Sequence, residues 1–400
     1  MRMATAEVGN GAVLDVAGRI GPRRSLWRGA RFITEVFDGA DDALAALEAV
    51  QGGLTSTGFQ TLDWLTVLYE ELAPSQHAMP RLLVVTERNT GEIALILPLV
   101  IRKKRTLKVA HFADLGVSDY GGPILGPALL KKGRSIRRAW RAIRQALRDV
   151  DLIRLERMPA QIGGRPNPLI TRSGITPARH SGNVLVVPET VEDYVRSRGK
   201  KFRKEIERCH RLWEKEGAPR FYRATTPEEI ARVYSVLEEQ QSARHAALGS
   251  KYVLDEPAYR AFYERLAMDG SDAELAALFA VEAQGEIVAA LFGIVHDGAF
   301  TLLRISTAGQ VGSHLSPGRL VVVEAMKYFV ARGVRHFDMG IGDYPFKRGF
   351  GVEDVPLYDL IVARDLSAVP RALFHRLKGR LRQNKLARAV YQRLKPVLER

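Results

Sequence analysis

The sequence contains two similar β-hairpins that lie far apart in the chain, at residues 81–101 and 274–295. Each reads as an apolar strand, a polar turn that ends in Gly-Glu-Ile, and a longer apolar strand, and the turn glycines are Gly91 and Gly285. One Gly-Glu turn is a weak signal, but apolar strands on both sides of each turn predict a structural repeat. We therefore expect two similarly built halves that meet near residues 176–187.

The length of 400 residues is about twice that of a usual single domain, which agrees with two halves. Strand and helix patterns alternate in both halves, so we expect an α/β (α+β) fold. In the second half, Thr226 and Glu229 predict a capping box at the start of a helix. The expected domain organisation is a flexible lead at residues 1–29, a first domain at 30–178, a second domain at 179–365 and a basic tail at 366–400.

The composition is that of a folded soluble protein, with 46% hydrophobic and 26% charged residues. The single cysteine, Cys209, excludes an internal disulfide and fits a reducing compartment. No apolar run is long enough to cross a membrane, and the N-terminus lacks the apolar core of a signal peptide. The sequence therefore predicts a cytoplasmic protein.

The formal net charge of +15 is concentrated in three stretches that we expect to be helical, residues 131–148, 196–211 and 371–400. Separate basic helices indicate solvated helix faces rather than one compact nucleic-acid motif. The last stretch carries apolar residues four positions apart, beginning with Leu373 and Leu377, so a narrow apolar stripe runs along a cationic helix. This stripe either packs back onto its own domain or lies peripherally on the inner face of a membrane.

A helix start in the second half is a candidate anion site. Ser316 is placed to cap this helix, and Pro317 suits its first position. Gly318 removes a side chain where the backbone amides of Gly318, Arg319 and Leu320 are expected to point outward without partners. Unpaired amides and the helix dipole favour an anion, and Arg319 adds a positive charge. The alternative is that the Ser-Pro pair simply starts a helix.

This helix joins a strand at residues 299–307 to a strand at residues 334–342, so the three form a β-loop-α-β unit. If the two strands separate at their ends, the gap holds a linear pantetheine arm with its pyrophosphate at the helix start. The acyl carbon then lies near the strand ends, where the polar turn at residues 343–348 emerges.

Residues 314–351 read HLSPGRLVVVEAMKYFVARGVRHFDMGIGDYPFKRGFG. This run resembles the C-terminal signature of the GNAT-fold acetyltransferases of the cellulose-biosynthesis (CelD/BcsL) type, with Ser-Pro-Gly at the helix start, Arg-Gly at its end and Phe-Asp before Gly-Asp. Residues 199–217 resemble the basic helix of that family, and residues 240–249 resemble its Arg-containing segment. The resemblance extends over residues 30–360 and is specific only over 314–351.

The resemblance implies two GNAT-like domains, each a mixed, mostly antiparallel sheet flanked by helices. It also implies acetyl-CoA or another acyl-CoA as co-substrate, without a metal. The FemABX peptidoglycan aminoacyltransferases are similar in architecture, since they also pair two GNAT-like halves. The chain departs from the family pattern at two places: Gln310 and Gly312 match the usual pyrophosphate loop only in part, and Phe346-Lys347 stands where relatives have Tyr-Lys.

The turn after the last strand supplies three candidate catalytic residues, Asp343, Tyr344 and Lys347. Acyl transfer needs a base and stabilisation of a developing oxyanion. Asp343 would orient or deprotonate the acceptor, Lys347 would neutralise carbonyl or phosphate charge, and Tyr344 would protonate the leaving thiolate. The alternative is structural: Asp343 caps the turn, Lys347 is solvated and Tyr344 packs beside Phe346 and Phe350.

Candidate acceptor contacts occur in both halves. In the first half, Asp119 and Tyr120 precede two glycines in a polar loop that would bind the acceptor, and a plain loop is the alternative. In the second half, Arg203 and Arg244 are candidates, with ion pairs to nearby glutamates as the alternative. The first half has no Ser-Pro-Gly helix start, so we expect the donor only in the second half.

Other chemistries have weaker support. None of the nine histidines stands at a metal-ligand spacing from another His or Cys, which argues against a zinc site. The sequence has no Gly-x-Ser-x-Gly motif, no Walker loop and no complete Gly-x-Gly-x-x-Gly motif. Cys209 lies in a basic helix without an adjacent His and Asp, which favours direct transfer over a covalent acyl-enzyme.

The sequence thus predicts an acyltransferase of the N-acetyltransferase type. It would move an acyl group from acyl-CoA to an amine or hydroxyl of a small molecule or of a saccharide precursor of the cell envelope. Two alternatives stay open. One is an aminoacyltransferase that uses charged tRNA, with the basic helices binding RNA. The other is a non-catalytic accessory protein of polysaccharide synthesis that keeps only the fold.

Overall fold

The chain forms two compact units in a computed structural model. Residues 1–179 and 356–400 make the first unit, and residues 180–355 make the second. The chain thus returns to the first unit after the second, whereas the sequence analysis placed residues 356–365 in the second domain. Most of the predicted lead and the end of the predicted tail lie outside the described residues. The structure describes residues 13–14, 20–21, 25–28, 31–50, 52–104, 106–128, 133–215, 219–309 and 316–383.

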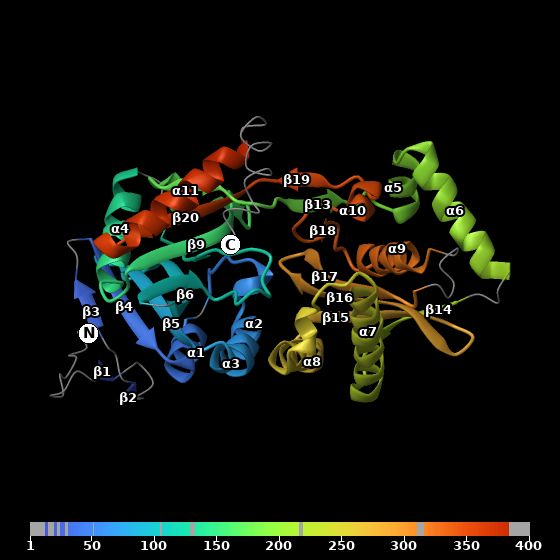
Figure 1. The fold of residues 1–400 in the computed structure, drawn as a ribbon, viewed down its shortest axis with the longest axis horizontal. Helices are drawn as coiled ribbons and strands as arrows, with labels where there is room; N and C mark the ends of the chain where they lie inside the picture. The colour runs from blue at the N-terminus through green and yellow to red at the C-terminus, as the bar shows by residue number, and fades with distance from the viewer. Residues whose placement is uncertain are drawn as a thin grey trace. The chain divides into compact units, whose positions relative to one another are not determined.

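The first unit is built on one mixed sheet (Figure 1). All neighbours in it are antiparallel except β7 and β9, which are parallel. The short strand β8 (Ile124–Leu125) also pairs with β6. The strands run in the spatial order β12 (Ile175–Pro177), β20 (Leu357–Ala363), β9 (Leu152–Pro159), β7 (Leu107–Phe112), β6 (Ile93–Lys104), β5 (Ala78–Glu87), β4 (Phe32–Asp38) and β3 (Ser25–Arg28).

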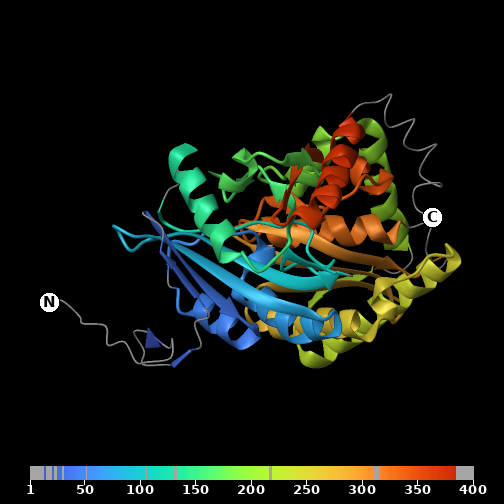
Figure 2. The same cartoon turned by 60° about the vertical axis from the view of Figure 1, so that its left-hand side comes forward.

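Helices cover both faces of this sheet, as Figures 1 and 2 show. Helices α1 (Ala40–Glu48), α2 (Leu62–Val67) and α3 (Ala73–Ser75) lie on one face, and α4 (Gly133–Ala146) lies on the other. Helix α4 packs its apolar side into a buried core with the sheet. Helix α11 (Val369–Gln383) packs against β12 and β20. Two small ladders complete the unit: β1 (Val13–Leu14) with β2 (Ile20–Gly21), and β10 (Gln161–Ile162) with β11 (Arg165–Pro166).

The second unit is also built on one mixed sheet, in which only β17 and β18 are parallel. Its strands run in the order β14 (Arg220–Ala224), β15 (Ala276–Ala283), β16 (Glu286–His296), β17 (Ala299–Thr307), β18 (His336–Asp338), β13 (Gly182–Val186) and β19 (Glu353–Val355). One face carries α5 (Val191–Ser197), α6 (Lys200–Lys215) and α9 (Pro317–Val330), which share a core with the strands. The other face carries α7 (Pro227–Ala247) and α8 (Pro257–Asp272) (Figure 1), and the short helix α10 (Pro345–Gly349) follows β18.

The two sheets repeat one strand order. In the first unit the hairpin β5–β6 leads to β7, then to α4 and to the parallel strand β9. In the second unit the hairpin β15–β16 leads to β17, then to α9 and to the parallel strand β18. Gly91 and Gly285, in the two hairpin turns, have φ angles of 73° and 82°, which glycine adopts without strain. The predicted repeat and the fold class of two mixed, mostly antiparallel sheets flanked by helices are confirmed.

The predicted capping box of α7 is confirmed as well. The hydroxyl of Thr226 accepts a hydrogen bond from the amide of Glu229 at 3.2 Å. The carboxylate of Glu229 reaches back and accepts from the amide of Thr225 at 3.0 Å. The first bond satisfies an amide that the first turn of a helix otherwise leaves without a partner, and the second fixes the residue before the cap.

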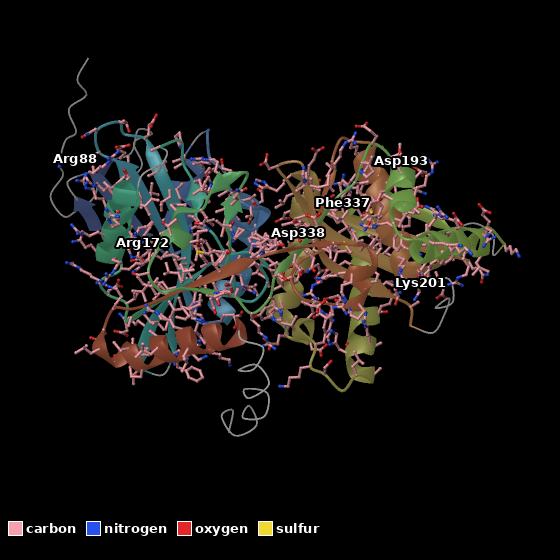
Figure 3. All side chains as sticks on the ribbon, turned by 90° about the horizontal axis from the view of Figure 1, so that it is seen from above. Arg88, Arg172, Asp193, Lys201, Phe337 and Asp338 are labelled. Carbon is pink, nitrogen blue, oxygen red and sulfur yellow. The ribbon has the colours of Figure 1, made fainter. Side chains whose placement is uncertain are left out.

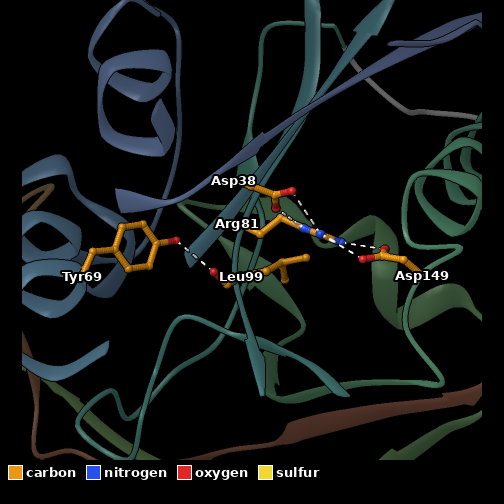
Figure 4. Close-up of polar contacts among 5 residues, drawn as sticks. All are labelled: Asp38, Tyr69, Arg81, Leu99 and Asp149. Atoms are coloured by element: carbon orange, nitrogen blue, oxygen red, sulfur yellow. Dashed lines mark hydrogen bonds and ion pairs between the residues drawn. The ribbon is translucent and has the colours of Figure 1, made fainter. Parts of the chain in front are cut away.

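An ionic cluster around Arg81 lies inside the first unit (Figure 4). The Arg81 side chain, 3% exposed, donates to the two carboxylate oxygens of Asp38 at 2.5 and 3.2 Å. It donates equally to both oxygens of Asp149, at 2.8 and 3.0 Å. One buried guanidinium is thus compensated by two bidentate carboxylates, one at the end of β4 and one in the turn between α4 and β9. In the same view, the buried hydroxyl of Tyr69 donates to the carbonyl of Leu99 at 3.2 Å.

Candidate active site

The parallel strands β17 and β18 separate soon after they meet. Their ladder runs only from the pair Ala299–His336 to the pair Thr301–Asp338. Strand β18 ends at Asp338, which is labelled in Figure 3. Strand β17 continues to Thr307 with only β16 paired beside it. Beyond Thr301, β17 therefore has no paired strand on the side where β18 lies.

The unpaired edge of β17 directs backbone groups toward this opening. In an antiparallel ladder, alternate residues face the two neighbouring strands. The amide of Ala308 donates to Val288 of β16 at 3.0 Å, so Ile305 and Thr307 face away from β16. The carbonyl of Ile305 accepts a hydrogen bond from Nε2 of Gln241 on α7 at 2.9 Å, which places this side chain at the edge. Such an edge can bind an extended ligand as it would bind another strand.

Helix α9 begins at Pro317, as predicted, but Ser316 does not cap it with its side chain. Ser316 has a left-handed backbone, with φ 52° and ψ 51°, and capping through the hydroxyl requires an extended backbone. The amides of Arg319 and Leu320 donate to the carbonyl of Ser316 at 3.0 and 3.3 Å. The prediction of three unpaired amides is thus wrong for two of them. The amide of Gly318 has no partner within the described part of the chain.

The start of α9 packs closely on the open end of β17. A Cβ atom placed on Gly318 would lie 3.1 Å from Cγ2 of Thr307 and 3.9 Å from Cδ1 of Ile305. Glycine therefore allows this close approach of helix and strand. The loop residues Gln310 and Gly312, which the family resemblance compares with a pyrophosphate loop, lie outside the described residues.

Helices α6 and α10 meet α9 at its start. Arg319 forms a hydrogen-bonded ion pair with Glu205 of α6, so its charge is already compensated. A Cβ atom on Gly349 of α10 would lie 3.7 Å from Nη2 of Arg319. Cys209 of α6 is buried and hydrogen-bonds Ser316, and burial raises the pKa of its thiol. A protonated thiol is a poor nucleophile.

The three candidate catalytic residues around α10 differ in their surroundings. Nζ of Lys347 donates to the carbonyl of Ile341 at 2.6 Å and lies 5.3 Å from the ring centroid of Tyr344. Tyr344 is 60% exposed. The Asp343 side chain is 77% exposed and forms an ion pair with Arg348. The fold therefore holds Lys347 in place, while Asp343 and Tyr344 project into solvent.

The backbone between β18 and α10 is fixed by Asn183 of β13. Its buried side-chain amide donates to the carbonyls of Gly340 and Gly342 at 2.6 and 2.9 Å. Both glycines have positive φ, 74° and 98°, which residues with a side chain rarely adopt. The two glycines thus shape the turn that leads from the end of β18 to Lys347.

Sequence reasoning missed a polar cluster on the face of the sheet that carries α7 and α8. Arg304 of β17 lies 4.1 Å from the ring centroid of Tyr263 on α8 and donates to Oε1 of Gln241 at 3.1 Å. The hydroxyl of Tyr252 donates to the same oxygen at 2.5 Å. Burial raises the pKa of Tyr252 to about 12, so its hydroxyl stays a donor. These two bonds orient the Gln241 amide that reaches Ile305. In the sequence, the only signal of this cluster was an arginine, Arg304, inside an apolar strand.

Asp338 was also missed as a site residue, although it belongs to the Phe-Asp pair of the family signature. It is 9% exposed and accepts a hydrogen bond from the amide of Gly340 at 2.7 Å. The ring of Phe337 packs 6.1 Å from that of Phe329 on α9. Because strand side chains alternate, Asp338 points to the face that carries α7 and α8, where Arg304 also lies. A buried carboxylate therefore stands where the strands part, on the side away from α9.

The two arginines predicted to contact the acceptor lie in different environments. Nε of Arg203 on α6 is 3.7 Å from Oε1 of Glu207. Arg203 thus forms the ion pair with a nearby glutamate that the alternative interpretation predicted. Arg244, in the last turn of α7, is exposed, and its side chain has no partner among the residues that the structure describes. It follows Gln241 by three positions, which places the two on neighbouring parts of one helix face.

Asp119 and Tyr120 lie in the first unit, in the loop after β7. Tyr120 is 7% exposed, and its ring packs edge-on against Phe59 at 5.8 Å. Its carbonyl accepts a hydrogen bond from Nε2 of Gln60 at 3.1 Å. Asp119 is half-buried and interacts electrostatically with Arg157. Tyr120 is thus a core residue, and Asp119 is the more accessible of the two.

Residues 200–348 match the family model described as an acetyltransferase (GNAT) domain. The match begins with the first residue of α6 and ends inside α10, so it includes β17, α9 and β18. These residues, less than half of the chain, are therefore similar to a GNAT acetyltransferase domain. The two parallel strands and the helix start described above both lie within the matched residues.

Among solved structures, the chain is similar to a crystal structure of FemX, with a TM-score of 0.55 and 11% identity over 81% of this chain and 96% of that chain. This likeness shows the fold. More distant matches include L-PGS from Bacillus licheniformis, with a TM-score of 0.49 and 12% identity over 84% of this chain and 95% of that chain. A tandem GNAT protein from the clavulanic acid biosynthesis pathway has a TM-score of 0.43 and 12% identity over 83% of this chain and 99% of that chain. No curated protein sequence matches significantly.

Within the described ranges, no three His, Cys, Asp or Glu side chains gather as a possible metal site. No helix of these ranges combines the length and the apolar character needed to cross a membrane.

Proposed function

We propose that the GNAT domain transfers an acyl group from acyl-CoA directly to an amine or hydroxyl of a small-molecule or saccharide acceptor. The observation that carries the proposal is the early end of the β17–β18 ladder beside the start of α9. Beyond the ladder, the amides of Ile305 and Thr307 face away from β16, and pantetheine carbonyls can pair with them as an added strand does. The helix start suits the pyrophosphate.

On the donor side, residues 316–320 would hold the diphosphate through the amide of Gly318 and the dipole of α9. Arg319 would contribute charge only by exchanging Glu205 for a phosphate oxygen, so we assign it mainly to fixing α6 beside α9. Helix α6 adds positive potential near this end, and Figure 3 shows Lys201 on it. The exposed cations of α6 are Lys200, Lys201, Lys204, Arg208, Arg211 and Lys215.

The chemical step forms a bond between the acceptor and the acyl carbon and breaks the C–S bond of the thioester. Lys347 would neutralise negative charge on the thioester oxygen or on the phosphates. Asp338 would take the acceptor proton, because it is buried where β17 and β18 part. The exposed Asp343 would orient the acceptor, and Tyr344 would give a proton to the leaving thiolate. The buried Cys209 takes no part in this direct transfer.

Acetyl-CoA is expected to raise the melting temperature of the protein. A ligand that binds only the folded state stabilises it by about 2.7 kcal/mol at a hundredfold excess over its Kd. A thermal melt with and without acetyl-CoA measures this, and mass spectrometry of the purified protein shows whether a thioester co-purifies. If neither acetyl-CoA nor longer acyl-CoA thioesters shift the melting temperature from that of the protein alone, acyl-CoA is not the donor.

A second candidate is aminoacyl transfer from charged tRNA. It is favoured by the exposed cations of α6 and by the fold likeness to FemX. This candidate requires RNA binding that weakens steeply with salt and no stabilisation by acetyl-CoA. A non-catalytic accessory protein would show neither response. The CelD/BcsL assignment, a role in polysaccharide synthesis and a place at the inner face of the membrane are further proposals that follow from the sequence resemblance and the basic tail.

A further inference from the structure

Helix α11 has one face occupied by the first unit. Ala372 is 3% exposed, in a small core with the sheet. Nε and Nη2 of Arg376 donate to the carbonyl of Ile361 at 2.9 and 2.6 Å. A Cβ atom on Gly379 would lie 2.8 Å from Thr176 of β12. These contacts recur at helical spacing, so they fix which side of the helix faces the sheet.

The opposite face of α11 presents large apolar side chains to solvent. Leu373 and Leu377 are each 57% exposed, and Phe374 is 50% exposed. Leu366, in the turn before the helix, is 87% exposed. The sequence predicted a Leu373–Leu377 stripe that either packs on its domain or meets a membrane. The helix does pack on its domain, but it does so with small residues and Arg376, and the stripe points outward.

Positive charge surrounds this outer face, which comprises Leu366, Leu373, Phe374 and Leu377. Arg371 precedes Phe374 by one turn, and Lys378 follows it by one turn, with Nζ 5.9 Å from the ring centroid. From residue 371 to the end, the sequence has ten basic residues and one acidic residue, Glu399. An apolar stripe bordered by Lys and Arg is the pattern of helices that lie in a membrane interface.

We propose that the outer face of α11 binds an anionic lipid surface. The apolar side chains enter the boundary between headgroups and acyl chains, and the cations pair with lipid phosphates. A nucleic acid would use the cations but would leave these four large apolar side chains in water. The lipid surface is the partner that satisfies both parts of the face. This proposal goes beyond acyl transfer and does not depend on it.

Vesicle co-sedimentation of the full chain tests the proposal. Vesicles of phosphatidylcholine with about 30 mol% phosphatidylglycerol are expected to bind the protein at least about tenfold more strongly than pure phosphatidylcholine vesicles, because the headgroup charge attracts the basic helix. Salt at about 0.5 M should weaken this binding severalfold by screening. Equal binding to both kinds of vesicle, or binding to neither, overturns the proposal.

The triple variant Leu373→Ser, Phe374→Ser and Leu377→Ser removes the three apolar side chains that the outer face has on α11 and keeps every charge. Its binding to the anionic vesicles is expected to fall at least about tenfold, since three side chains that would enter the membrane are lost. Leu248→Ser in the second unit is the matched control, because Leu248 is 69% exposed and caps the C-terminal end of α7. This variant should bind like the unmodified protein. Unchanged binding of the triple variant overturns the proposal. The proposal is also overturned if sedimentation velocity shows a dimer for the unmodified protein and a monomer for the triple variant, since the face would then be a self-association surface.

Discussion

Lys347→Ala and Asp338→Asn are each expected to lower kcat at least about 100-fold while the melting temperature stays unchanged. Lys347 is held by the carbonyl of Ile341 at 2.6 Å, so its charge is preorganised. Asn at position 338 can still accept the hydrogen bond from the Gly340 amide, so the turn is kept and only the proton acceptor is lost. The measurement is thiol release from acetyl-CoA with a pooled mixture of amine and amino-sugar acceptors.

Two matched variants separate chemistry from general effects of charge. Lys327→Ala removes a lysine of α9 that pairs with Glu324 at 2.8 Å, and it should change kcat less than about twofold, as surface pairs contribute little. Asp343→Asn should lower turnover less than Asp338→Asn, because Asp343 is 77% exposed and paired with Arg348. Full activity of Lys347→Ala and Asp338→Asn would remove both site assignments.

Arg81→Met is expected to destabilise the first unit by about 3–5 kcal/mol. The substitution leaves the carboxylates of Asp38 and Asp149 without the buried guanidinium that both now bind. Guanidinium chloride unfolding measures the change. Arg31→Met is the matched control: Arg31 is 39% exposed and pairs with Glu87 at 2.8 Å, so its loss should cost about 0.2–1 kcal/mol. Equal costs for the two variants would show that burial does not strengthen the Arg81 cluster.

The same cluster gives the first unit a specific response to acid. Burial alone would raise the pKa of Asp149, but its hydrogen bond with Arg81 and the charge of Arg81 hold that pKa below the usual 3.8. A carboxylate with a lowered pKa contributes stability above its unfolded pKa, and this stability is lost as the pH falls through the folded value. The stability difference between the unmodified protein and Arg81→Met should therefore shrink below about pH 4.

The parts of the fold that the sequence predicted correctly depend on neighbouring residues. The two hairpins follow from apolar runs around Gly91 and Gly285, and the capping box of α7 follows from Thr226 and Glu229, three positions apart. The start of α9 at Pro317 follows from the restricted φ of proline. In each case the interaction that decides the structure lies within one turn or one hairpin of the chain.

The parts that the sequence did not reveal depend on distant residues. The compensation of Arg319 comes from Glu205, on another helix, so the sequence suggested a free cation at the start of α9. The orientation of Gln241 on α7 comes from Arg304 on β17 and from Tyr252, which follows the end of α7. The left-handed backbone of Ser316 likewise cannot be read from a Ser-Pro pair that usually marks a capped helix.

Isothermal titration of CoA and of pantetheine into the full chain tests the central claim most directly. If the start of α9 binds the diphosphate while the edge of β17 binds the arm, CoA should bind at least about tenfold more tightly than pantetheine, since charge-assisted hydrogen bonds contribute about 1.5–3 kcal/mol each. Equal affinities would contradict a diphosphate site at Gly318, and no heat with either compound would contradict acyl-CoA as the donor.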